Sequence, residues 1–174
     1  MPFQSVSASR SPAYTTGALV LFAAVAVILA ALAFEHIGGY KPCELCLQQR
    51  WAYYVTIPLL FVALVLLGAQ QHRVAGAILL ACALAFLANA GLSAYHAGVE
   101  WEFWAGPDTC SAGALQPLPK SGAELLKSLA RPEVVPCTAA QLRVFGISFA
   151  GWNFLASLAL FAGTAKAMIA ALRR

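Results

Sequence analysis

Four long stretches of this chain carry almost no charge, and each is long enough to cross a membrane as a helix. They run over about residues 17–34, 51–68, 74–94 and 147–172. A helix rises about 1.5 Å per residue, so about 20 apolar residues span a hydrocarbon core of about 30 Å. The pattern predicts an all-α membrane protein, a four-transmembrane-helix bundle forming a single integral membrane domain over residues 1–174.

The composition points to lipid as the surrounding solvent. Hydrophobic residues make up 61% of the chain and charged residues 10%, whereas an ordinary soluble domain has about 25% charged residues. The abundance of Leu, Val, Ile, Phe and Trp excludes intrinsic disorder. The net charge of +4 rests on 11 Lys and Arg against 7 Asp and Glu, with no dense basic cluster. We therefore expect contact with membrane lipid and no binding of nucleic acid.

The connections between the spans predict how the chain is threaded. Residues 69–73 form a turn short enough to make the second and third spans an antiparallel hairpin. The loops at about 35–50 and 97–146 then share one side of the membrane, and both termini share the other. Lys and Arg are denser beside the termini and the turn, which favours cytoplasmic termini and extracytoplasmic loops. Residues 121–131 of the long second loop have the pattern of a short amphipathic helix.

The placement of the five cysteines is more informative than their number. Cys82 lies within the third span, where a free cysteine packs as a small hydrophobe. The other four fall in pairs in the two loops: Cys43 and Cys46, then Cys110 and Cys137. Disulfides persist in an oxidising extracytoplasmic compartment. Four cysteines allow three pairings, and the sequence does not choose among them.

The first pair stands at the predicted start of the second helix. Proline is favoured at the first position of a helix, so a second helix that starts at Pro42 would have Cys43 and Cys46 in its first turn. Helix N-termini and CxxC spacings lower thiol pKa values and so produce reactive thiolates. Arg50 follows on the same helical face as Cys46, where it would stabilise a Cys46 thiolate or an anionic acceptor, or anchor the helix to headgroups. His96 stands at the matching depth of the third span, as an anchor or as part of a shared site.

The second pair, Cys110 and Cys137, lies 27 positions apart in the sequence and allows two interpretations. It is either a structural staple or, together with the first pair, a relay for thiol–disulfide exchange. A zinc site built from all four cysteines is disfavoured because the second pair is so widely spaced, and no metal is expected. The sequence also lacks a nucleotide-binding motif, so a membrane-dissolved quinone suits the location as an electron acceptor. The alternative is a structural or transport membrane protein whose disulfides only staple its loops.

The segment over residues 36–50, with Lys41-Pro42-Cys43-x-x-Cys46 followed by Arg50, resembles the bacterial DsbB family of disulfide bond formation proteins. The four spans and the spacings from His96 to Cys110 and from Cys110 to Cys137 agree. The resemblance implies a thiol:quinone oxidoreductase of the bacterial inner (cytoplasmic) membrane, with periplasmic active-site loops and ubiquinone or menaquinone as its quinone. The chain departs from the family pattern at residues 48, 49 and 101–104, which bears on the choice of partner and quinone.

By position, the resemblance also implies a role for each candidate residue. A periplasmic DsbA-like thioredoxin-fold protein would form a transient mixed disulfide with Cys110, whose disulfide mate would be Cys137. Cys43 and Cys46 would then accept the electrons, with Cys46 facing the quinone. Two residues would bind or polarise the quinone: Arg50 and His96.

Overall fold

The computed structural model describes residues 11–107, 110, 136–138 and 142–173 of the 174-residue chain. Its elements are α1 (Pro12–His36), α2 (Glu44–Gly68), α3 (His72–Glu100), β1 (Arg143–Val144), β2 (Ile147–Ser148) and α6 (Phe149–Leu172). The four helices of the described part are each long and apolar enough to cross a membrane. The predicted four-helix membrane fold is therefore confirmed.

The boundaries of the connections differ from those expected. The first loop, expected over about 35–50, occupies only 37–43 because α2 already begins at Glu44. At the second loop, α3 continues to Glu100, past its expected end at 94. Residues 143–148 form a small antiparallel hairpin in front of α6, so the span expected from 147 begins as a strand. The amphipathic helix expected at 121–131 lies outside the described residues.

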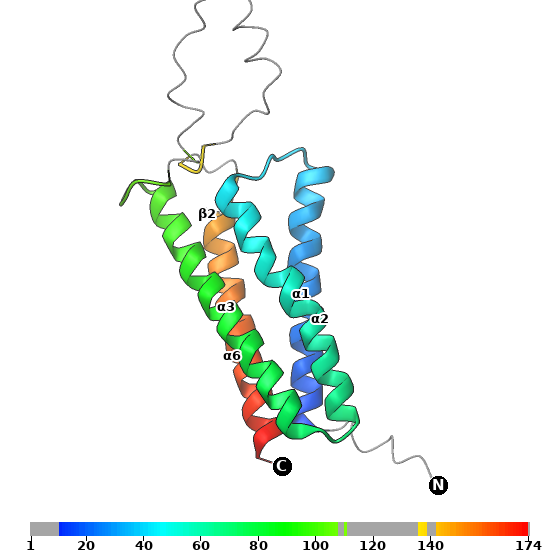
Figure 1. Ribbon diagram of the computed structural model, residues 1–174. Coiled ribbons are helices and arrows are strands. Elements are labelled where there is room, and N and C mark those ends of the chain that lie inside the picture. Colours follow the sequence, from blue (N-terminus) through cyan, green and yellow to red (C-terminus); the bar gives the residue numbers. More distant parts are fainter. Residues whose placement is uncertain (1–10, 108–109, 111–135, 139–141, 174) are drawn as a thin grey trace, which may run out of the picture.

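The four helices lie side by side along their length (Figure 1). α3 packs against α6 and α2, and α1 packs against α6 and α2. The start of α1, the end of α6 and the α2–α3 turn meet at one end, which we call the terminal end. Residues 37–43 and the β1–β2 hairpin meet at the other end, which we call the loop end. The two expected loops therefore do share one end of the bundle.

Side chains at the helix starts explain where three of the helices begin. The Ser11 hydroxyl accepts the Tyr14 N–H at 3.1 Å in front of Pro12, and the Ser148 hydroxyl accepts the Gly151 N–H at 3.2 Å. Such caps satisfy backbone donors that have no partner within the helix. α2 is capped by a sulfur, since Cys43 Sγ accepts the Cys46 N–H at 3.4 Å. The Cys43 sulfur therefore both caps α2 and belongs to the candidate site.

The interior of the terminal half is apolar and closely packed. It is built largely from small residues, which let helices approach one another when no solvent drives them together: Ala13, Ala63, Ala75, Ala167 and Ala171 are all at most 1% exposed. A Cβ added at Gly76 would lie 2.7 Å from Leu172 Cδ2, so α3 and α6 touch at that point. Cys82 is fully buried in the same core.

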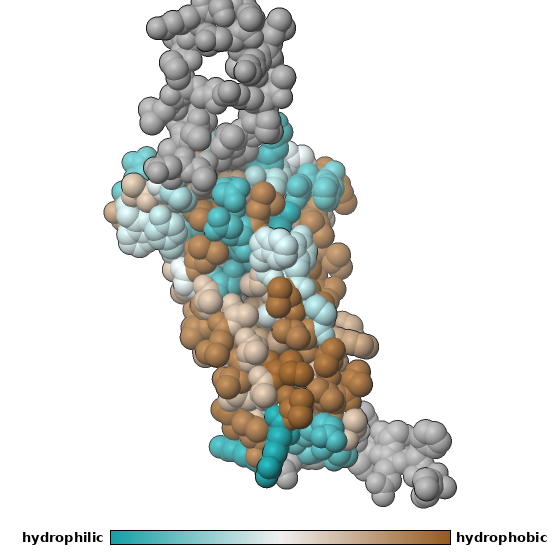
Figure 2. Space-filling view, in the orientation of Figure 1, coloured by the Kyte–Doolittle hydropathy of each residue, from teal (hydrophilic) through white to brown (hydrophobic). Residues whose placement is uncertain are grey.

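On the face drawn in Figure 2, the surface of the bundle is mainly apolar between two polar ends. Large apolar side chains such as Leu19, Phe22 and Phe61 are at least 60% exposed. A soluble monomer rarely exposes such a continuous apolar surface. The surface therefore fits a bundle whose sides contact lipid and whose ends contact water.

Candidate functional site

The first cysteine pair lies at the N-terminus of α2, at the loop end. Cys43 is the N-cap and Cys46 lies in the first turn, with their sulfurs 3.0 Å apart and not bonded. Three groups face the Cys43 sulfur: the Cys46 thiol, the Cys46 N–H and the His96 ring at 3.5 Å. Hydrogen bonding from Cys46 and then from His96 lowers the pKa of the Cys43 thiol to about 4, against burial, which acts to raise it. Cys43 is thus the thiolate of the pair.

The second pair forms a disulfide between Cys110 and Cys137, with its Cα atoms 5.3 Å apart. Both residues are buried, and they pack with Cys43, Leu45 and Val99 in a small apolar cluster at the loop end. The spacing had left three pairings open, and the structure selects this one.

The two pairs meet at His96. Cys43 Sγ, Cys137 Sγ and a His96 ring nitrogen all lie within 4.8 Å of one another. His96 is 2% exposed and comes from α3, so the site joins α2, α3 and the segment before the hairpin. A metal ion would need thiolate ligands, and the disulfide withholds Cys137 from that role.

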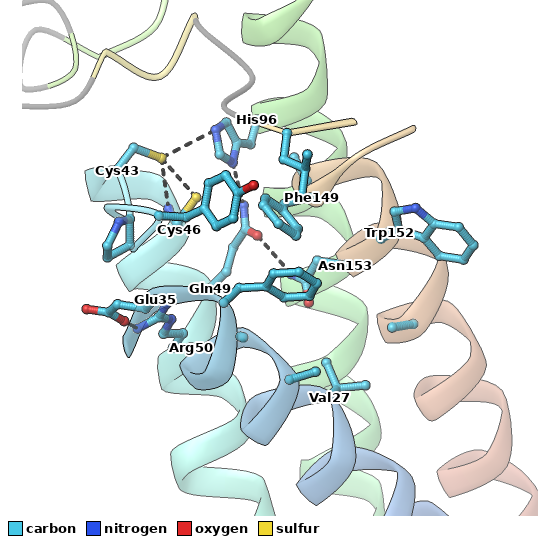
Figure 3. A pocket seen from close by; sticks show the side chains of 18 of the residues that line it. Val27, Glu35, Cys43, Cys46, Gln49, Arg50, His96, Phe149, Trp152 and Asn153 are labelled. Atoms are coloured by element: carbon cyan, nitrogen blue, oxygen red, sulfur yellow. Dashed lines mark hydrogen bonds and ion pairs between the residues drawn. The ribbon is translucent and has the colours of Figure 1, made fainter. Parts of the chain in front are cut away.

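A cavity of about 530 Å³ opens beside Cys46 and His96 (Figure 3). Its walls are mainly apolar, and many of the apolar side chains come from α1 and α6, including Val27, Phe34 and Phe149. The Phe34 and Phe149 rings pack with centroids 5.0 Å apart. A mainly apolar pocket with a few convergent polar groups is the usual form of a site for a small organic molecule.

Arg50 lines this cavity but does not point to the cysteines. Its guanidinium pairs with the Glu35 carboxylate of α1, and both side chains are mostly buried. Arg50 lies one helical turn after Cys46 in α2, as expected. Its ion-pair partner, Glu35, was not expected from the sequence. The pair fixes the guanidinium at the cavity wall, near the loop end of α1.

Glu100 is a second carboxylate at the cavity. Its side chain is 6% exposed, with Oε1 3.9 Å from His96 Nε2. Its other oxygen has no hydrogen-bond partner among the described residues. A buried carboxylate without full hydrogen bonding is costly and commonly functional. It lies one helical turn after His96.

Buried polar side chains continue below the site into the bundle. Gln49 joins His96 to Asn153 of α6, and Asn153 in turn contacts Tyr53 and Ser93. Sequence reasoning did not single out Tyr53, Ser93 or Asn153, and it noted Gln49 only as a departure from the family pattern. The available signal was the presence of amide and hydroxyl groups within otherwise apolar helices, which lipid penalises. The partners come from three helices far apart in sequence, so spacing alone did not reveal them.

Comparisons with known proteins find one matching family and several related proteins. The family described as disulfide bond formation protein DsbB matches residues 14–167. A disulfide bond formation protein B of Saccharophagus degradans is 32% identical over 164 residues, covering 88% of this chain and 92% of the relative. The corresponding protein of Verminephrobacter eiseniae is 29% identical, covering 79% and 76%. An uncharacterized protein of Rickettsia prowazekii is 25% identical, covering 82% and 79%.

No solved structure gives a significant match to this chain. The family match includes both cysteine pairs, all of α2 and α3 and most of α1 and α6. The chain therefore belongs to the DsbB family of disulfide bond formation proteins.

Proposed function

We propose that this protein is a membrane thiol:quinone oxidoreductase that re-oxidises a periplasmic DsbA-like dithiol protein. In the net reaction the partner's dithiol loses two electrons and two protons and becomes a disulfide, while a quinone becomes a quinol. The observation that carries the proposal is the meeting of the two cysteine pairs. Cys43 Sγ and Cys137 Sγ lie within 4.8 Å at the rim of a mainly apolar cavity.

The partner's electrons enter at the loop disulfide. A thiolate of the partner attacks Cys110 Sγ, which forms a mixed disulfide, breaks the Cys110–Cys137 bond and releases Cys137 as a thiolate. The partner's second thiol then attacks its own sulfur in the mixed disulfide. That thiol gives its proton to water, the partner leaves as a disulfide, and Cys110 leaves the mixed disulfide with the electron pair as a thiolate.

The same exchange chemistry passes the electrons to the first pair. The Cys137 thiolate attacks Cys43 of a Cys43–Cys46 disulfide, and Cys46 leaves with the electron pair. Cys110 then attacks Cys137, which restores the loop disulfide and releases Cys43 as a thiolate. The structure, with Cys110–Cys137 bonded and the other two sulfurs 3.0 Å apart, has the bonding of this last stage. The low pKa of Cys43 favours its departure as a thiolate.

The residues around the cavity fit a quinone of the ubiquinone or menaquinone type. Apolar side chains of α1 and α6, such as Val27 and Phe149, suit a ring and its hydrocarbon tail, while Arg50 and His96 supply polar groups near Cys46. A bound quinone would accept two electrons and two protons. Arg50, held by Glu35, would donate hydrogen bonds to a quinone oxygen. The mainly apolar walls would keep water from the reacting sulfur.

The proposed orientation places the loop end in the periplasm and both termini in the cytoplasm of a bacterial inner membrane. Arg73 and Arg173 lie at the terminal end, with Lys166 on the last turns of α6. Glu35, Glu44, Glu100 and Glu102 lie at the loop end. The basic terminal end fits the cytoplasmic side, and the oxidising periplasm fits a loop disulfide.

A purely structural role for the cysteines is the competing function. The Cys110–Cys137 bond does close a loop of the kind that staples stabilise. Cys43 and Cys46 lie within one helical turn, so a bond between them closes too small a ring to hold separate elements together. The first pair is therefore poorly suited to stapling and well suited to exchange.

Anaerobic mixing of the purified protein with a reduced DsbA-like protein and a quinone tests the proposal. We expect quinol formation with one partner disulfide per quinol, followed by quinone absorbance and thiol titration. Cys46→Ser is the matched control because it removes one sulfur and keeps the size of the side chain. If the unaltered protein forms quinol no faster than Cys46→Ser, the proposal is wrong. A protein with only stapling disulfides would keep its role after both pairs are reduced and alkylated.

A further inference from the structure

A chain of hydrogen bonds connects the backbone of α3 to the imidazole of His96, by way of α6 and α2. Its members are Ser93, Asn153, Gln49 and His96, and three of these are at most 5% exposed: Gln49, Ser93 and His96. Each group in the chain has a limited set of donors and acceptors. The chain can therefore be followed from one end to deduce which ring nitrogen of His96 carries the proton.

The chain starts at a group that can only accept. Ser93 Oγ lies 2.7 Å from the backbone carbonyl oxygen of Asn89, so the single hydroxyl proton is donated there. Ser93 Oγ can then only accept from its other neighbour, which lies 2.7 Å away and must be Asn153 Nδ2. The Asn153 amide is thereby oriented, with Oδ1 accepting from the Tyr53 hydroxyl at 2.6 Å.

The orientation of the Asn153 amide determines that of the Gln49 amide, which in turn faces the His96 ring. The second proton of Asn153 Nδ2 is donated to Gln49 Oε1 at 2.8 Å. Gln49 therefore presents its Nε2 donor to His96 Nδ1 at 3.0 Å. A ring nitrogen that faces an N–H must offer its lone pair, so the proton of the neutral imidazole resides on Nε2. Nε2 is the nitrogen 3.5 Å from Cys43 Sγ.

We propose that Gln49 and Asn153 are positioning residues that hold His96 in the Nε2–H tautomer, so that the ring donates to the Cys43 sulfur. The inference deepens the proposed function and rests on it for its catalytic meaning. Cys43 must carry negative charge when it is released from Cys137 and before it re-forms its bond to Cys46. A donor already in place stabilises that charge without rearrangement. The opposite tautomer would face the thiolate with a lone pair.

Among the described residues, the titratable side chains that interact with the Cys43 sulfur are Cys46 of α2 and His96 and Glu100 of α3, while the nearby Cys137 sulfur is held in the disulfide. Glu100 Oε1, 3.9 Å from Nε2, would also attract a proton to this nitrogen. The test must therefore change the hydrogen bond to His96 Nδ1 and leave Cys46 and Glu100 unchanged.

Nitrogen NMR of the histidine-labelled protein, with Cys43 and Cys46 reduced and the Cys110–Cys137 disulfide intact, measures the tautomer directly. We expect His96 to show a protonated Nε2 and an unprotonated Nδ1. In Gln49→Leu, which removes the donor to Nδ1, and in Asn153→Leu, which frees the Gln49 amide to turn without touching the ring, both tautomers should be populated. Thr164→Val is the control, because the Thr164 hydroxyl is buried in α6 and bonds only to the backbone of its own helix. It should retain the single tautomer.

The alkylation rate of Cys43 against pH supplies a second measurement. In both leucine variants the midpoint should rise by about one pH unit, the effect of weakening one hydrogen bond to a charged group, while Thr164→Val should keep the midpoint of the unaltered protein. A protonated Nδ1 in the unaltered protein, or a tautomer unchanged by Gln49→Leu, would overturn the inference. Neither measurement uses quinone or partner. Failure of quinol formation with the expected tautomer would therefore count against the proposed function alone.

Discussion

The two halves of the bundle are built from the same four helices but are filled differently. In the terminal half, alanines and glycines bring the helices together, and the buried Thr164 hydroxyl bonds to its own helix backbone. In the loop half, Gln49, Asn153 and His96 bond across three helices to one another. Packing holds the first half, whereas directional bonds position the second. Substitutions in the terminal half should therefore mainly change stability, and substitutions in the loop half should mainly change the chemistry of the site.

The largest expected effect on stability lies in the terminal half. Leu79 is fully buried there, and Leu79→Ala should lower the free energy of unfolding by about 2–5 kcal/mol because it removes packed side-chain volume. Reversible unfolding in mixed detergent micelles measures this loss. The pH midpoint of Cys43 alkylation should remain that of the unaltered protein. A shifted midpoint would show that the two halves are not separable.

The next effect concerns the thiolate in the loop half. The hydrogen bond from the Cys46 thiol is the largest cause of the low pKa of Cys43, about 4. Because that bond stabilises the charged form, its removal in Cys46→Ala should move the pKa upward by about one to two units. In the unaltered reduced protein Cys43 should stay reactive down to about pH 4, and in the variant its reactivity should fall at higher pH. Alkylation followed by mass spectrometry measures both profiles.

An unchanged Cys43 profile in Cys46→Ala would contradict the assignment of the thiolate. Cys46→Ser is the matched comparison, since a hydroxyl keeps a donor at the same position and should preserve most of the shift.

A smaller effect is expected at the cavity wall. Arg50→Ala should raise the apparent KM for quinone by about ten-fold, since it removes a charged hydrogen-bond donor from the pocket. Steady-state rates at varied quinone concentration measure it. Arg50→Lys keeps the charge and should lose less. If KM is unchanged in Arg50→Ala while the protein remains folded, Arg50 serves only to anchor α1 and α2 through Glu35.

The smallest effect is expected at the fifth cysteine. Cys82 is buried in the apolar core, with its sulfur 4.0 Å from the Thr56 carbonyl oxygen. Cys82→Ala should leave quinol formation within about two-fold, because no part of the exchange route passes through it and the volume lost is small. A large loss of turnover in a folded Cys82→Ala protein would contradict this prediction, because it would assign a redox role to the terminal half.

Local signals in the sequence predicted the four spans, the common end of the two loops and the cysteine pair at a helix start. Those features follow from hydropathy and from residues adjacent in the chain, such as Pro42 beside Cys43. The helix expected to start at Pro42 begins two residues later, at Glu44 with Cys43 as its N-cap, ahead of the apolar span expected from residue 51, because its first turns are polar yet still helical. The hairpin at 143–148 was missed, although the Phe145-Gly146 pair, both at positive φ, forms a two-residue turn of the kind that joins short strands.

The partners of the site residues were not predictable in the same way. Gln49 meets Asn153 across α2 and α6, and Arg50 meets Glu35 across α2 and α1. Such contacts depend on the relative rotation and depth of neighbouring helices, which a single sequence does not specify. The matching depth of Arg50 and His96 did place both at one cavity, yet Arg50 pairs with Glu35 and not with the Cys46 thiolate that its spacing indicated.

The most direct test of the account is whether Cys43 and Cys137 exchange with each other. In a protein carrying Cys46→Ser, Cys110→Ser and Cys82→Ala, Cys43 and Cys137 are the remaining thiols. We expect mild oxidation to join them in a disulfide, identified by mass spectrometry of the linked peptides, because their sulfurs lie within 4.8 Å. The matched protein that retains Cys46 and carries Cys43→Ser should cross-link far more slowly. If both thiols of the first protein stay open to alkylation, or if the second protein cross-links as fast, the proposed electron route is wrong.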